Sequence, residues 1–285
     1  MRVVIDSSPA EWLSHAAPLL TRAEAENNLL LGLAAQAAAD TSGSDWEMHL
    51  LRTVDGEATV GAAMATRLNL ILSRQSEVGL SLIADELVRQ GVSPPGAVGP
   101  DQIPATFVRL WTQRTGATAT LRQDQRIHEC HRVVELPRAA GRYRQAAAAD
   151  VPVLADWWVA FHIDVGAARM DDDPAAAVGR LISRQDLFVW EDAGRIVSCA
   201  ATMRRTPHGA VVAFVYTPPV SRGRGYATSC VADLTRANLA AGADFCCLYT
   251  DLANPISNSI YARIGYVPVC DSQWWAASQE VEALF

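Results

Sequence analysis

A short turn rich in glycine and arginine, at residues 222–225, has the composition of an anion-binding site. Before it lies an apolar run, 211–216 (VVAFVY), whose β-branched and aromatic residues predict a buried strand. After it, from Tyr226, apolar residues recur at helical spacing until Gly242, which predicts a helix. Glycines let a backbone approach a ligand closely, and the first N–H groups of a helix have no partner within it. With two arginines and no acidic residue, the turn is typical of a phosphate site; a tight turn with solvated arginines is the alternative.

A second pattern follows at residues 246–266, CCLYTDLANPISNSIYARIGY. Together with the first, it resembles the GNAT superfamily of acyl-coenzyme A-dependent N-acyltransferases. The phosphate loop of that superfamily has the pattern Q/R-x-x-G-x-G/A, which is matched here by Arg222, Gly225 and Ala227. Its later helix has roughly the pattern N-x-x-A-x-x-L-Y-x-x-x-G-F/Y, which is matched, with serine for alanine at 257, by Asn254, Ser257, Ile260, Tyr261, Gly265 and Tyr266.

The resemblance implies that acetyl-CoA binds as a co-substrate, mainly through the backbone. The strand end would offer main-chain hydrogen bonds to the pantetheine arm through Val215, Tyr216 and Thr217. The pyrophosphate would be bound at the turn and helix start, by Arg222, Gly223, Arg224, Gly225, Tyr226, Ala227 and Thr228. Asn254 and Ser257 complete the implied cofactor contacts. A role as the N-cap of the helix that begins at Pro255 would by itself explain an asparagine at 254.

For catalysis, the resemblance implies direct transfer of the acetyl group to an amine held beside the thioester in a ternary complex. Orienting the two reactants removes much of the entropic barrier. Tyr261, at the tyrosine position of the superfamily, would be the general acid for the departing thiolate; packing on the sheet is a second explanation for this residue. A backbone N–H near Val215 or Tyr216 could polarise the carbonyl.

The general base is not identified by the sequence. The strand 211–216 lacks the glutamate that several relatives carry near this place, and Asp251, His162, His208 or an ordered water chain could serve. No Ser/His/Asp or Cys/His constellation requires an acyl-enzyme, so direct transfer is the simplest mechanism.

The acceptor site is expected at the first helix of the second half, which begins after Asp150 and contains Pro152. In the superfamily this helix and the loop after it help to form the acceptor pocket. Trp158 and His162 are therefore candidate substrate contacts, while core packing is favoured for Trp157 and Phe161. The run Asp171-Asp172-Asp173 could attract an ammonium group, but a solvated helix start is favoured.

Composition limits the classes of function. The 285 residues suffice for two domains, each with its own core. The net charge of −7 argues against a nucleic-acid binder and is compatible with a cationic small substrate. All 24 basic residues are arginines, which excludes lysine Schiff-base chemistry. The N-terminal segment has no apolar core of signal-peptide length, and the apolar stretch 29–39 is too short to span a bilayer, so no membrane association is predicted.

The six cysteines lie mostly within apolar strand or helix patterns, which predicts reduced, buried thiols and a cytoplasmic location. Cys130 belongs to His128-Glu129-Cys130-His131, a cluster that could suggest metal binding. Because residues 126–136 alternate like a strand, the two histidines would face opposite ways, and no metal site is predicted.

An internal repeat organises the chain. Residues 50–67 (LLRTVDGEATVGAAMATR) align without gaps on 187–204 (LFVWEDAGRIVSCAATMR), and each predicts a β-hairpin. We therefore expect two GNAT-like domains, 1–137 and 138–285, of class α/β (α+β), each with a mixed, mostly antiparallel sheet flanked by helices. The first copy has SRQSE at 73–77 in place of the glycine-arginine turn, and it lacks the pattern of 254–261.

The chain thus resembles a tandem GNAT protein whose N-terminal half is degenerate. We expect that half to be a scaffold, a wall of the acceptor site or an interface, since a fold can outlive its original function. Ligand binding by it and the oligomeric state are left open, although its exposed strand edges would suit a homodimer contact.

The predicted function is that of an acetyl-CoA-dependent N-acetyltransferase acting on a primary amine of a small molecule. The alternative, from another class, is a non-catalytic acyl-CoA sensor or assembly module. The acceptor and the preferred acyl chain length are not determined, because the sequence does not show the depth or lining of those pockets.

Overall fold

The computed structural model describes residues 1–40, 46–166 and 173–278. It divides into two compact units: unit 1 consists of Met1–His128, Tyr249–Pro255 and Pro268–Phe285, and unit 2 of Glu129–Leu248 and Ile256–Val267. The chain therefore passes between the units at four places. These units are defined by contacts between residues. The predicted domains 1–137 and 138–285 are defined by the sequence repeat instead, and they remain a prediction.

Unit 1 contains a sheet whose described pairs are antiparallel between β1 and β2, β2 and β3, β3 and β4, and β5 and β12, and parallel between β4 and β5. Its strands are β1 (Arg2–Asp6), β2 (Met48–Asp55), β3 (Ala58–Thr66), β4 (Leu70–Leu72), β5 (Gly96–Pro100), β6 (Thr118–Cys130) as far as His128, and β12 (Val267–Ser278) from Pro268. Its helices are α1 (Pro9–Leu20), α2 (Asn28–Ala39), α3 (Glu77–Arg89) and α4 (Ile103–Thr115), with a 3₁₀ turn at Thr21–Ala23.

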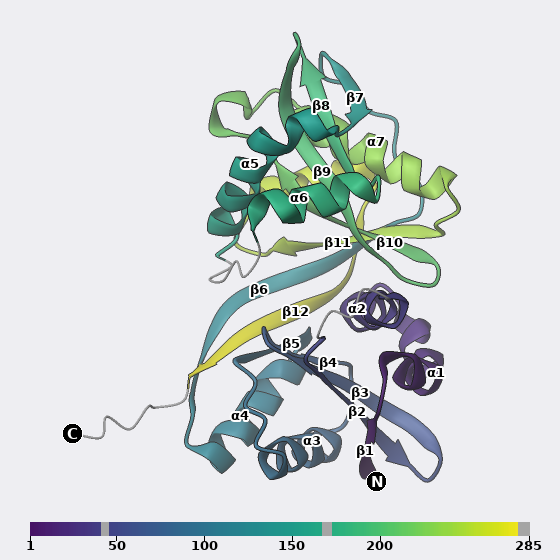
Figure 1. Cartoon of the computed structure of the whole chain (residues 1–285), viewed down its shortest axis with the longest axis vertical. Coiled ribbons are helices and arrows are strands. Elements are labelled where there is room, and N and C mark those ends of the chain that lie inside the picture. Colours follow the sequence, from purple (N-terminus) through teal and green to yellow (C-terminus); the bar gives the residue numbers. More distant parts are fainter. Residues whose placement is uncertain (41–45, 167–172, 279–285) are drawn as a thin grey trace, which may run out of the picture. The chain divides into compact units, whose positions relative to one another are not determined.

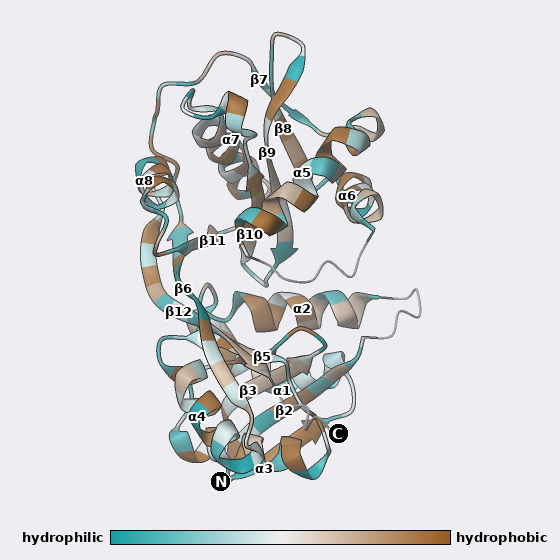
Figure 2. Ribbon diagram, turned by 90° about the vertical axis from the view of Figure 1, so that its left-hand side faces the viewer, coloured by the Kyte–Doolittle hydropathy of each residue, from teal (hydrophilic) through white to brown (hydrophobic). Residues whose placement is uncertain are grey.

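Strand alternation explains the two cores of unit 1. Leu50 and Met64 face α1 and α2, while their neighbours Leu51 and Ala65 face α3 and α4. The helix α2 carries no charged residue and is coloured hydrophobic over most of its length in Figure 2. Each face of the sheet is thus covered by two helices.

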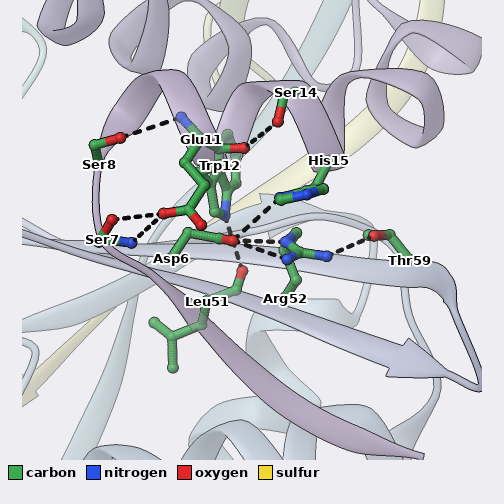
Figure 3. A network of polar contacts seen from close by, with 10 residues as sticks. All are labelled: Asp6, Ser7, Ser8, Glu11, Trp12, Ser14, His15, Leu51, Arg52 and Thr59. Atoms are coloured by element: carbon green, nitrogen blue, oxygen red, sulfur yellow. Dashed lines mark hydrogen bonds and ion pairs between the residues drawn. The ribbon is translucent and has the colours of Figure 1, made fainter.

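A buried ion pair joins β1 to β2 in unit 1 (Figure 3). The guanidinium of Arg52 donates to Asp6 through Nε at 2.6 Å and Nη2 at 2.8 Å, and the imidazole of His15 on α1 lies 3.3 Å from the same carboxylate. Asp6 and Arg52 are both buried, so their mutual attraction and hydrogen bonds offset the hydration that each charge loses.

Unit 2 repeats the arrangement. Its strands are β7 (Arg142–Gln145), β8 (Leu187–Asp192), β9 (Arg195–Arg205), β10 (Gly209–Tyr216) and, in its first residues, β11 (Phe245–Asp251). Its helices are α5 (Val151–Asp164), α6 (Pro174–Ser183), α7 (Tyr226–Ala240) and, from Ile256, α8 (Pro255–Ile264). The 3₁₀ turns Ala148–Asp150 and Pro219–Ser221 precede α5 and follow β10. One core lies between the sheet and α7 with α8, and the other between the sheet and α5 with α6.

The predicted class, α/β (α+β) with mixed, mostly antiparallel sheets flanked by helices, is confirmed. The strand predicted over 126–136 is wrong at both ends, since β6 spans Thr118–Cys130 and residues 131–137 form an irregular segment. His128 is buried on β6, and His131 lies beyond the strand with its Nδ1 3.1 Å from the carbonyl of Asp244.

No helix within the described ranges is long and apolar enough to cross a membrane. Nor do residues 1–40, 46–166 and 173–278 contain a group of three or more histidine, cysteine or acidic side chains that could hold a metal ion.

Candidate active site

The glycine-arginine turn connects β10 to α7, as predicted. Gly223 and Gly225 have φ angles of +77° and +79°, and Gly225 is the N-cap of α7. A Cβ atom at Gly223 would meet nothing within 4 Å, and one at Gly225 would meet only the Cβ of Ala139 at 3.8 Å. Glycine is therefore required here by the left-handed backbone and not by lack of space.

The first turn of α7 has free hydrogen-bond donors. In the described part of the chain, no side chain caps this helix and no acidic residue lies in its first turn. The amide of Ser229, which donates to the carbonyl of Gly225 at 3.0 Å, begins the helical bonding. The N–H groups of Tyr226, Ala227 and Thr228 precede it, at the positive end of the helix dipole, and are suited to an anion.

The two arginines of the turn differ in their surroundings. Arg222 donates from Nε to the carbonyl of Thr217 and from Nη2 to Asp164 at the end of α5, both at 3.0 Å. Arg224 is exposed and has no partner among the described residues. Arg224 is thus the cation of the turn that is available to a ligand. Arg222 could bind a ligand only by sharing its guanidinium between the ligand and Asp164, or by giving up the contact with Asp164.

The strand β10 contains a bulge that changes which face its side chains use. Ala213 pairs with Ala201 and Tyr216 with Cys199, so three steps along β10 match two steps along β9. Phe214, with φ of +49°, lies at this bulge. As a result Val212 faces the α7 side, while Phe214 and Tyr216 both face the α5 side.

In unit 2, β10 pairs in parallel with β11 from Gly209 to Val211. The last described pair joins Val211 to Cys247. The carbonyl of Tyr216 accepts from Ser198 on β9 at 3.2 Å, and Ser198 also lies 2.8 Å from the hydroxyl of Thr217. No strand partner within unit 2 is described for the other edge of Val212 to Tyr216. Such an edge can bind an extended ligand through main-chain hydrogen bonds.

Tyr261 lies on α8, one turn after Ser257. Its side chain is buried in the α7 core, with its ring edge-on to Tyr266 at a centroid distance of 5.8 Å. Burial raises the pKa of the Tyr261 hydroxyl above its ordinary value. The structure thus shows the core packing of this phenol, and its role as a general acid stays a prediction.

The aromatic residues of α5 gather against the bulge. Trp158 lies edge-on to Phe214 at 4.8 Å, and Nδ1 of His162 is 2.7 Å from the carbonyl of Trp158. Trp157 is buried, and Phe161 is partly buried in the same core. Trp158 and His162 are half-buried, so part of each side chain is exposed, and their role as substrate contacts stays a prediction.

The acidic candidates are engaged in local structure. In unit 1, Asp251 accepts from Gln123 at 3.0 Å and from the amide of Ala253 at 2.7 Å, so its carboxylate forms an Asx turn. Asp173 caps α6 by accepting from Ala175 at 3.1 Å, while Asp171 and Asp172 lie outside the described residues. Asp150 is the N-cap of α5 by position, but its carboxylate binds Arg144 instead of the helix amides.

Asn254 precedes α8 and is assigned to unit 1, so its predicted cofactor role stays a prediction. His208 lies in the turn between β9 and β10, where its carbonyl accepts from the amide of Asp244 at 2.8 Å.

Sequence reasoning missed the residues that hold the turn. Tyr226 was expected to contribute its backbone, but its buried side chain also donates to Asp192 at 2.5 Å. Asp164 binds Arg222, and Ser229 accepts from the amide of Ala139. These pairs join residues far apart in the chain, and no local pattern signals them.

Comparison with known proteins places these features in a family context. The model of the FR47-like protein family matches residues 192–276. No curated protein matches the chain closely enough to count as a relative.

Similar solved structures include a GNAT-family acetyltransferase from Colwellia psychrerythraea, with 14% identity, a TM-score of 0.59, and 98% of this chain and 100% of that one covered. A GCN5-related N-acetyltransferase from Sphaerobacter thermophilus is 16% identical, with a TM-score of 0.60 and coverage of 96% and 95%. A tandem GNAT protein from the clavulanic acid biosynthesis pathway is 11% identical, with a TM-score of 0.58 and coverage of 97% and 98%. The resemblance to the GNAT superfamily is therefore confirmed: this chain has the fold of a tandem GNAT protein over nearly its whole length.

Proposed function

We propose that the chain is an acetyl-CoA-dependent N-acetyltransferase that transfers the acetyl group directly to a primary amine of a small molecule. The observation that carries the proposal is the start of α7, where a left-handed glycine, uncapped amides and the exposed Arg224 lie together. This combination fits the pyrophosphate of coenzyme A. The FR47-like match and the GNAT fold support the same reaction class.

Within this proposal, the residues divide the work as follows. The amides of Tyr226, Ala227 and Thr228, with Arg224, would hold the pyrophosphate, and the free edge of Val212 to Tyr216 would hold the pantetheine arm. Tyr261 would protonate the departing thiolate. A backbone N–H near Val215 or Tyr216 would polarise the thioester carbonyl.

The acceptor would lie beside Trp158 and His162, on the α5 side of the bulge. We assign no general base, because Asp251 is engaged in its own turn and the imidazole of His162 lies against a carbonyl. None of the six cysteines, all of which lie in the described ranges, forms a disulfide, and five of them are buried, which favours a reducing, cytoplasmic location.

Calorimetric titration with acetyl-CoA tests the cofactor part of the proposal. We expect one site per chain, and we expect it to be lost in Gly225→Val because a β-branched residue does not adopt φ near +79°. Gly116→Val is the control, since it places the same strain, at φ of +71°, at the end of α4 in unit 1 and far in sequence from the glycine-arginine turn. Absence of binding by the wild-type chain would overturn the proposal.

Turnover then separates an enzyme from an acyl-CoA sensor. Small amines are screened as acceptors, and turnover is detected by the release of free coenzyme A. At least one amine should be acetylated. Binding of acetyl-CoA without turnover of any amine would favour the sensor. Two equivalent binding sites would show that the first half also binds the cofactor.

A further inference from the structure

The segment 138–141, which precedes β7, lies against the first two turns of α7. The amide of Ala139 donates to Oγ of Ser229 at 2.9 Å, and the guanidinium of Arg138 pairs with Asp233. The indole of Trp190 on β8 donates to the carbonyl of Ala140 at 2.7 Å. Three consecutive residues of an irregular segment are thus fixed by polar contacts.

The groups that α7 offers to this segment form one stripe. Tyr226, Ser229 and Asp233 are spaced i, i+3 and i+7, so they lie on the same face of the helix. Tyr226 donates to Asp192 at the end of β8, and the other two bind the segment 138–141. Every polar side chain of the stripe is used to hold the helix start.

The α7 side of these contacts is shielded from solvent, while the side chain of Arg138 is 59% exposed and Asp233 also pairs with Arg236. Ser229 is 6% and Tyr226 5% exposed, and the side chain of Asp233 is 13% exposed. Arg138 also lies over the buried ring of Trp190, with Cζ 5.4 Å from its centroid. Cation–π and ion-pair contacts made together fix a guanidinium better than either contact alone.

The segment also lies beside the turn, since a Cβ atom added at Gly225 would lie 3.8 Å from the Cβ of Ala139. Ser229 supplies the first helical hydrogen bond of α7, to the carbonyl of Gly225. A shift of the segment would therefore move the residue that ends the turn. Donors that are fixed before a ligand arrives bind it without a further ordering cost.

We propose that the segment 138–141 is a positioning element of the acetyl-CoA site. It fixes the first turn of α7 through Ser229 and Asp233, and so aims the amides of Tyr226 to Thr228 at the pyrophosphate. The inference rests on the proposed function for its ligand. Its residues are positioning residues, since none of them has to touch the cofactor.

The test uses the full-length chain with Ser229→Ala and Arg138→Ala. We expect the Kd for coenzyme A, measured by calorimetry, to rise about three- to tenfold in each variant while the stoichiometry stays at the wild-type value. Ser229→Thr and Arg138→Lys keep the acceptor oxygen and the charge, and should restore most of the affinity. Arg142→Ala is the matched control, because it removes an exposed arginine that pairs with Glu191 and not with α7.

A second measurement separates positioning from general loss of stability. Hydrogen exchange followed by mass spectrometry should show faster exchange at residues 226–229 in Ser229→Ala, with unchanged exchange in α5 and α6. Wild-type Kd values together with unchanged exchange in both variants would overturn the inference. If the wild-type chain does not bind coenzyme A, the proposed function fails, while the exchange measurement still decides whether the segment fixes α7.

Discussion

Two helices at corresponding places of the repeat, α3 in unit 1 and α7 in unit 2, begin in opposite ways. At α3, the hydroxyl of Ser76 accepts from the amide of Gly79 at 3.2 Å, and Glu77 places a carboxylate in the first turn. At α7, the N-cap is a left-handed glycine and no side chain caps the described helix start. The first helix thus has a capping side chain and a favourable charge at its start, whereas the described start of the second has neither.

The loops before the two helices differ in the same sense. In unit 1, Arg74 pairs with Glu26 at 2.8 Å and with Asp101, and Gln75 accepts from Thr53 at 3.0 Å. These side chains fill the place of the glycine-arginine turn. In unit 1, protein groups thus partner the side chains of the loop that corresponds to the glycine-arginine turn.

The parallel strand pairs differ as well. A Cβ at Gly99 on β5 would lie only 2.7 Å from the carbonyl of Leu72 on β4, so these strands remain in close contact. The cavity beside them is about 10 Å³, enough for about one water molecule. β10 has instead a bulge and parts from β11 after Val211. The two units thus differ at this position in their helix caps and in the bulge of β10.

The largest effect is expected from Tyr261→Phe. Each of the two corresponding helices is followed by a glycine with positive φ, Gly265 after α8 and Gly116 after α4. Four residues before the glycine, α8 has Tyr261 and α4 has Thr112, so the phenol is present in unit 2 and absent at the corresponding position of unit 1. Loss of the general acid should lower kcat by about 100-fold and leave the Kd for acetyl-CoA unchanged. The control is Tyr143→Phe, which removes a buried hydroxyl with no described partner.

The pH dependence of kcat sharpens this prediction. The acid acts in its protonated form, and burial raises the pKa of Tyr261, so its deprotonation moves to higher pH. The contribution of this residue to kcat should therefore persist up to about pH 10, the ordinary pKa of tyrosine. An unchanged kcat in Tyr261→Phe would remove the acid assignment.

An intermediate effect is expected from Thr228→Glu, which gives α7 the acidic first turn of α3. The carboxylate should stabilise the helix by about 0.3–1 kcal/mol through the dipole. It should also weaken coenzyme A binding by about tenfold or more, because it repels the pyrophosphate. Thermal unfolding and calorimetry should thus move in opposite directions, and Thr228→Gln, of similar size without charge, should show neither change. Coenzyme A binding that survives Thr228→Glu would mean that the phosphates bind elsewhere.

The smallest effect is expected from Ser76→Ala in unit 1. Loss of this cap should cost about 1 kcal/mol of unfolding free energy, measured by denaturant titration. The Kd for coenzyme A should stay at the wild-type value, because the proposed phosphate site lies at α7. A change in that Kd would contradict the contrast between the two helix starts.

Local signals predicted most of the elements. The alternation of 50–67 and 187–204 predicted two hairpins, and their turns have Gly56 and Gly194 at positive φ. The helical spacing after Tyr226 predicted α7, because a 3.6-residue period needs no distant partner to be visible. The strand predicted to run to residue 136 failed, since alternation does not reveal where sheet pairing ends.

The sequence by itself determined the fold class, the glycine-arginine turn and the tyrosine of α8, because each depends on residue type at short spacing. Only the tertiary structure decided which cation is free, since Arg222 meets Asp164 from a helix 58 positions earlier. It also decided on which face of the sheet the side chain of Phe214 lies, because the bulge in β10 has no sequence signature. The contacts of segment 138–141 with α7 likewise appear only in the structure. Such pairings depend on long-range register and packing, which no local pattern encodes.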